Sequence, residues 1–125
     1  MCLNLTFGCN VINRTLLHQF RTKYCQFSNA VLRKLVSDVK SVEPLQFSVI
    51  VDGTRDISGS EQESVCIRYV DNELTPHDIF LGMYAVTDTS GDFLCRMLCD
   101  VLLRHNLPLS SLRGQTYDGA SAMTL

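Results

Sequence analysis

The sequence lacks the patterns of a secreted, membrane-bound or zinc-finger protein. Its N-terminus has no basic segment before an unbroken apolar stretch, because Asn4, Asn10 and Asn13 interrupt the apolar residues, so no signal peptide is indicated. No apolar run is long enough to span a bilayer, and we expect no membrane partner. No Cys or His pair has zinc-finger spacing. These absences predict an intracellular protein.

An even number of cysteines could pair as disulfides, but the cysteines of this chain agree with an intracellular protein. No secretory pattern supports a disulfide framework, so we expect the thiols to be buried and reduced. Cys95 and Cys99, four residues apart in a helical pattern, leave open a metal or redox pair as an alternative to packing on the helix. The six cysteines are Cys2, Cys9, Cys25, Cys66, Cys95 and Cys99.

Acidic residues are scarce in the first third of the chain. Residues 1–40 hold six Lys or Arg and a single acidic residue, Asp38, a net charge of +5, whereas residues 41–125 have a net charge of −7. The acidic part is poorly suited to nonspecific nucleic-acid binding, which needs clustered cations. The basic part, from Arg14 to Lys40, is predicted to be either a solvated helix face or a DNA contact.

The length and composition predict one domain with a hydrophobic core. The chain has 125 residues, of which 46% are apolar and 19% charged, so it can bury a core and is not expected to be disordered. Residues 1–27 are weakly patterned, and we treat them as a separate N-terminal segment. Residues 28–125 are predicted to form the domain.

Two helices are predicted from apolar residues at helical spacing. The first begins at Ser28, a good N-cap residue, and ends before Pro44. The second covers residues 90–105, where Thr89 and Asp92 have the spacing of a capping box. It carries the strongest amphipathic stripe in the chain.

Four strands are predicted, the first three as an antiparallel meander. They cover residues 46–52, 64–70, 79–86 and 112–118. Short connections join the first three, whereas the helix at 90–105 separates the third from the fourth. A crossover of that length allows the fourth strand to pair in parallel with the first.

Two of these strands end on an aspartate. Parallel pairing would place Asp52 and Asp118 side by side at one edge of the sheet, where two carboxylates could hold a divalent metal through hard oxygen ligands. A structural alternative stays open for each. Asp52 could cap a turn by accepting N–H bonds from Thr54 or Arg55, and Asp118 could be the N-cap of a helix that opens at Gly119.

The residues around both aspartates resemble conserved motifs of hAT-superfamily transposase-derived proteins. The first motif is matched by residues 47–58 (FSVIVDGTRDIS) and continues through residues 61–70 (EQESVCIRYV). The second is matched by residues 112–123 (LRGQTYDGASAM). The nearest subgroup is the uncharacterised domain of zinc-finger MYM-type and related domesticated transposase proteins.

This resemblance implies a partial RNase H-like α/β fold. Three antiparallel strands, a crossover helix and a fourth strand parallel to the first would follow an N-terminal helix. It also implies an acidic triad that binds two Mg²⁺ or Mn²⁺ ions for DNA strand cleavage and transfer, with Asp52 as the first member and Asp118 as the second. DNA and a transposase-like chain, as a dimer partner, are the implied partners.

Departures from the family pattern predict a truncated and catalytically inactive fragment. The third carboxylate of the triad is expected beyond Leu125, and Gly53 and Arg55 replace an acidic residue and a threonine that the family usually has. The family's zinc finger and dimerisation region are not recognised. We therefore expect a protein-interaction or nuclear regulatory role; the alternative is a metal-dependent transposase core completed by sequence outside this chain.

Overall fold

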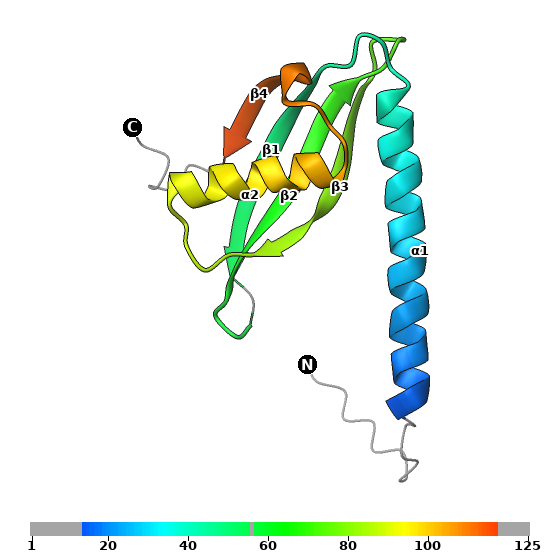
Figure 1. Cartoon of the computed structure of the whole chain (residues 1–125), viewed down its shortest axis with the longest axis vertical. Coiled ribbons are helices and arrows are strands. Elements are labelled where there is room, and N and C mark those ends of the chain that lie inside the picture. Colours follow the sequence, from blue (N-terminus) through cyan, green and yellow to red (C-terminus); the bar gives the residue numbers. More distant parts are fainter. Residues whose placement is uncertain (1–13, 56, 118–125) are drawn as a thin grey trace. The chain divides into compact units, whose positions relative to one another are not determined.

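The computed structural model describes residues 14–55 and 57–117, with side chains from residue 18 onward. The chain divides into two compact units, residues 1–33 and residues 34–125. In chain order the elements are α1 (Arg14–Lys40), β1 (Phe47–Arg55), β2 (Glu61–Val70), β3 (Pro76–Ala85), α2 (Gly91–Arg104), the short 3₁₀ helix η1 (Leu109–Ser111) and β4 (Leu112–Tyr117) (Figure 1).

Helix α1 begins at Arg14, so the prediction that Ser28 caps its N-terminus was wrong. The hydroxyl of Ser28 instead donates to the carbonyl of Cys25 at 3.1 Å, a bond that satisfies a serine inside a helix. Residues 14–27 contain neither glycine nor proline, so nothing interrupts the helix there. The helix starts in the first unit and ends in the second.

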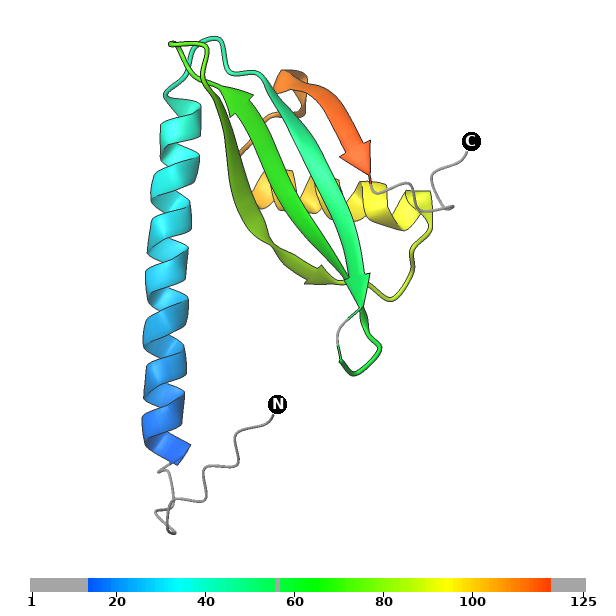
Figure 2. The same ribbon diagram turned by 180° about the vertical axis from the view of Figure 1, so that it is seen from behind.

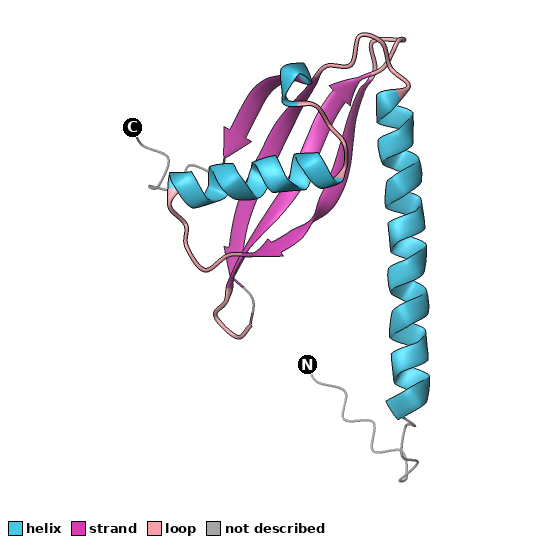
Figure 3. Ribbon diagram, in the orientation of Figure 1, coloured by secondary structure: helices cyan, strands magenta, loops and turns pink. Residues whose placement is uncertain are grey.

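The sheet has the order β3-β2-β1-β4 (Figure 3). Strand β2 pairs antiparallel with both β1 and β3, and β4 pairs in parallel with β1, as predicted. Helix α2 makes the crossover that parallel pairing requires. The α/β fold class and the parallel fourth strand are therefore confirmed.

Strands β1 and β2 extend beyond their predicted ends. Strand β1 was expected to end at Asp52 but continues to Arg55, which pairs with Glu61 at the start of β2. The backbone ladder continues past the buried residues, because main-chain hydrogen bonds do not depend on apolar side chains. Asp52 consequently lies within the ladder, opposite Ser64, and not at the end of the strand.

The core lies between α2 and one face of the sheet. Figures 1 and 2 show α2 across that face, and Figure 2 shows the opposite face without a helix over it in the unit that begins at residue 34. Every second residue is buried from Phe47 to Val51 in β1 and from Glu63 to Ile67 in β2, in agreement with the period of a half-covered sheet. The buried apolar residues of the strands and α2 are Phe47, Val49, Val51, Val65, Ile67, Ile79, Leu81, Leu94, Leu98, Val101 and Leu102.

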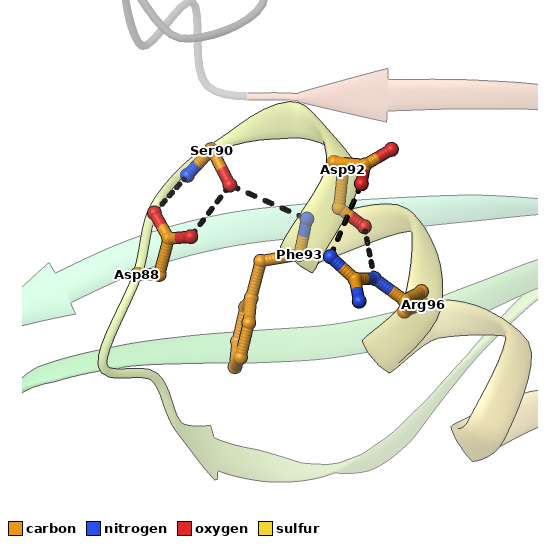
Figure 4. A network of polar contacts seen from close by, with 5 residues as sticks. All are labelled: Asp88, Ser90, Asp92, Phe93 and Arg96. Atoms are coloured by element: carbon orange, nitrogen blue, oxygen red, sulfur yellow. Dashed lines mark hydrogen bonds and ion pairs between the residues drawn. The ribbon is translucent and has the colours of Figure 1, made fainter.

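The N-cap of α2 is Ser90, and the prediction of a capping box at Thr89 was wrong (Figure 4). The Ser90 hydroxyl accepts from the N–H of Phe93 at 3.4 Å. It also donates to the carboxylate of Asp88 at 2.7 Å, and the Ser90 N–H donates to the same carboxylate at 2.8 Å. These bonds from Ser90 lower the pKa of Asp88.

Two ion pairs lie on the exposed face of α2. Arg96 contacts Asp92 at 3.1 Å, drawn in Figure 4, and Arg104 contacts Asp100 at 2.8 Å. Both pairs have the four-residue spacing that brings side chains together on a helix. Exposed pairs of this kind contribute little stability, so α2 is held mainly by its buried stripe.

Candidate functional site

We call the sheet face opposite α2 the open face. The strand registers arrange it in three rows that cross β1, β2 and β3. The first row is polar, the second apolar, and the third contains the candidate site. The rows are Ser48, Arg68 and Asp78; Ile50, Cys66 and Phe80; and Asp52, Ser64 and Met83.

Asp52 lies on the open face with an exposed side chain. Its main-chain carbonyl accepts from the hydroxyl of Ser64 at 3.1 Å, which anchors the backbone at this position. Among residues 14–55 and 57–117, no hydrogen bond or ion pair holds its carboxylate. The predicted turn cap is wrong, because Thr54 and Arg55 continue the strand ladder and form no turn.

Strand β4 brings the second motif beside the first. Val51, which precedes Asp52, pairs with Tyr117, and Ile50 pairs with Thr116. Asp118 follows Tyr117 directly but lies outside the described residues. The neighbouring position of the two carboxylates and the metal site that they would form therefore stay a prediction, as does the alternative that Asp118 is a helix N-cap.

The other carboxylate in the rows of the open face, Asp78, is paired with an arginine. Asp78 accepts two bonds from the guanidinium of Arg68, at 2.6 and 2.7 Å. This pairing lowers the pKa of Asp78 and raises that of Arg68, since each ion stabilises its partner's charged form. At the end of the β1–β2 hairpin, Glu61 accepts from Arg55. Within the described ranges, no three His, Cys, Asp or Glu side chains are grouped so as to hold a metal ion.

The described cysteines are free, but most are not buried. Cys25, Cys95 and Cys99 are exposed, so the prediction of burial was wrong for them, while Cys66 is half-buried on the open face. Burial is the main cause that raises the pKa of Cys66, and the negative charges of Asp78 and Asp52 raise it further. All of these effects favour the protonated thiol.

Cys95 and Cys99 lie together at a small groove between α2 and the sheet. Burial raises the pKa of the Cys99 thiol, and contact with Cys95 raises it further. The groove has a volume of about 100 Å³, and most of its other lining is apolar: Val49, Leu98, Leu102, Leu109, Leu112 and, with polar groups, Gln115 and Tyr117. Apolar walls around the two thiols fit packing on the helix flank better than metal coordination.

A search with protein-family models matches residues 13–125 to the family described as the ZMYM1/FAM200 RNase-like domain. The chain belongs to this family. No curated protein and no solved structure gives a match. None of the described helices is long and apolar enough to cross a membrane. In this RNase-like domain, both motif aspartates fall within the matched residues.

The arginine pairs were not recognised from the sequence. Arg68 and Asp78 are ten residues apart and meet only because β2 and β3 pair in a register that places them opposite one another. That register contains an irregularity between Val65 and Cys66, which no sequence pattern marked. The available signal was Arg68 on one predicted strand and Asp78 directly before the next, but its use required the register.

Proposed function

We propose that this chain is part of a domesticated or degenerate hAT-transposase domain that acts in protein interaction or nuclear regulation and does not cleave DNA. Membership of the RNase-like family and the confirmed parallel pairing of β1 with β4 support the fold on which this proposal rests. The hAT descent is supported by the resemblance of the two motifs that contain Asp52 and Asp118. The nuclear role is part of the same inference from the family.

The observation that carries the loss of catalysis is the pairing of Asp78, the other carboxylate in the rows of the open face, with Arg68. A two-metal centre needs several carboxylates free to bind cations. The carboxylate of Asp78, two rows from Asp52, instead holds Arg68. The guanidinium neutralises this carboxylate and repels a divalent cation, so Asp78 cannot assist Asp52 without breaking its ion pair.

A second candidate function is a metal-dependent DNA-transferring core. It is favoured by the register of Val51 with Tyr117, the two residues that directly precede the motif aspartates in the chain, and by the exposed carboxylate of Asp52. The hard oxygens of two aspartates suit Mg²⁺ or Mn²⁺. When bound, such ions would activate an attacking oxygen and stabilise the leaving oxygen at a phosphodiester.

Metal titration and a cleavage assay separate the two functions. We would follow thermal unfolding of the chain with increasing Mn²⁺, for the native sequence, for Asp52→Asn and for Glu73→Gln as a charge-matched control in an exposed turn. A ligand that binds only the folded state raises the unfolding temperature. We expect no metal-dependent cleavage of DNA by any of the three proteins.

The outcomes are distinct. Cleavage that depends on Mn²⁺ and is lost in Asp52→Asn would refute the inactive function and support the transposase core. Stabilisation by Mn²⁺ that disappears only in Asp52→Asn, without cleavage, would show a retained metal site in an inactive domain. Equal behaviour of all three proteins would support a purely structural Asp52.

A further inference from the structure

The first unit carries an exposed aromatic stripe. Phe20, Tyr24, Phe27 and Val31 recur at intervals of four, three and four residues along α1. At 3.6 residues per turn, these positions fall within an arc of roughly 60°. The side chains are 53%, 74%, 70% and 42% exposed, respectively. A run of large apolar side chains with this spacing is typical of a helix that packs against a partner.

Cations flank the aromatic stripe on both sides. Arg21 and Lys23 lie roughly 90° and 70° from its centre, on opposite sides, by helical geometry. Both residues are exposed. Residues 1–33 contain four basic residues and no acidic residue, so no ion pair within this stretch can neutralise them. The surface therefore combines apolar anchors with an uncompensated positive border.

We propose that the aromatic stripe of α1 binds an acidic amphipathic helix of a protein partner. The apolar face of such a helix would cover Phe20, Tyr24 and Phe27, and its carboxylates would meet the cationic border. Aromatic anchors surrounded by charged residues are typical of helix recognition in grooves and coiled coils. This inference names a partner for the protein-interaction role proposed above and rests on it.

Charge separates this partner from a second copy of the same segment. Any pairing of residues 1–33 with themselves brings together cations only, because this segment has no Asp or Glu. Like charges beside a coiled-coil seam are unfavourable, and opposite charges set partner choice. An acidic helix would cover the apolar side chains of the stripe and pair with the cations beside it, whereas self-association would only cover the apolar side chains.

The test measures binding of the full chain to a synthetic helical peptide of three heptads, with Leu at the seam positions and Glu at the flanking positions. A matched peptide with Lys in place of Glu is the control. We expect the Glu peptide to bind and the Lys peptide to bind at least about ten-fold more weakly. Binding of the Glu peptide should also weaken as salt rises, since exposed charges are screened.

Variants locate the binding surface. The double variant Tyr24→Ser with Phe27→Ser should weaken binding by about ten-fold or more, as expected when aromatic anchors are removed. Gln26→Ser with Asn29→Ser, on the opposite side of α1, should leave the affinity unchanged. Circular dichroism of both double variants checks that helix content is retained, so a loss of binding reports the surface and not unfolding.

Four results would overturn the proposal. These are no binding of the Glu peptide, equal binding of both peptides, a dimer in sedimentation that Tyr24→Ser with Phe27→Ser disperses, or binding to phosphatidylserine vesicles or DNA in preference to the Glu peptide. The dimer would assign the stripe to a second copy, and the last result to an anionic membrane or nucleic acid. None of these results depends on Asp52 or Mn²⁺, so failure here leaves the cleavage test of the proposed function intact.

Discussion

Substitution of two neighbouring leucines in α2 gives a direct test of how the helix is held on the sheet. Leu102 is 1% exposed and faces the core, whereas Leu103 is 73% exposed on the same turn. Leu→Ala at either position removes the same atoms from the same helix, so changes in helix propensity largely cancel. Only the burial of the two side chains differs.

The expected magnitudes follow from that difference. Removing three carbon atoms from the core at Leu102 costs about 2.4 kcal/mol in transfer free energy, and the cavity left behind raises the total to about 3 kcal/mol. Leu102 already borders the groove of about 100 Å³, so the cavity would be continuous with it. At Leu103 only about a quarter of the transfer term applies, or about 0.6 kcal/mol.

Urea unfolding followed by far-ultraviolet circular dichroism measures both variants. With a slope of about 1–3 kcal/mol per molar urea, Leu102→Ala should lower the midpoint by about 1–3 M. The urea midpoint of Leu103→Ala should fall by only about a fifth as much as that of Leu102→Ala. Equal shifts for the two variants, or a larger shift for Leu103→Ala, would refute the placement of α2 on the sheet.

Three further predictions concern the cap, the acid stability and the thiols. Ser90→Ala should destabilise the fold by about 1 kcal/mol through loss of the N-cap, whereas Thr89→Ala should change the urea midpoint little. A hydrogen bond from His77 lowers the folded pKa of Asp71, so the stability that it contributes is present above the unfolded value of 3.8 and is lost as pH falls through the folded value. Urea midpoints of Asp71→Asn should therefore fall less steeply below pH 3.8 than those of the native chain. Iodoacetamide should label Cys66 more slowly than the exposed cysteines at pH 8, because its pKa is raised and it is half-buried, and peptide mass spectrometry would measure the rates.

The sheet and the crossover could be predicted because their signals are local. Alternation of apolar and polar residues around Val49 and Ile67 marks half-buried strands, and the stripe around Leu98 marks the helix that covers them. The length of the connection between β3 and β4 then restricted the topology to a crossover. These features depend on residue type and spacing, both of which the sequence contains.

Element boundaries and side-chain pairing could not be predicted in the same way. Gly53 and Thr54 are residue types common in turns, but they lie opposite Glu63 and Gln62 in the β1–β2 ladder, which keeps them in β1. Ser28 is a residue type that favours helix N-caps, but an uninterrupted helical segment precedes it. In both cases tertiary or neighbouring structure overrode a local preference.

The candidate site likewise could be predicted only in part. The strand that carries Asp52 and its parallel neighbour were predicted, because they depend on periodicity and topology. The arginine partners of Asp78 and Glu61 were not predicted, because these ion pairs depend on the registers between strands. Sequence reasoning therefore found Asp52 but not the ion pairs elsewhere on the sheet.

The position of β4 has a consequence for synthesis on the ribosome. Strands β1, β2 and β3 are consecutive and can pair as the chain emerges, but the other edge of β1 pairs with β4, the last strand in the part of the chain that the structure describes. At about 5–20 residues per second, Tyr117 follows Arg55 by several seconds. Throughout that interval the nascent meander presents the unpaired backbone of β1, a template for wrong strand pairing. A nascent chain stalled between β3 and β4 would keep this edge exposed, and we expect it to be prone to wrong strand pairing.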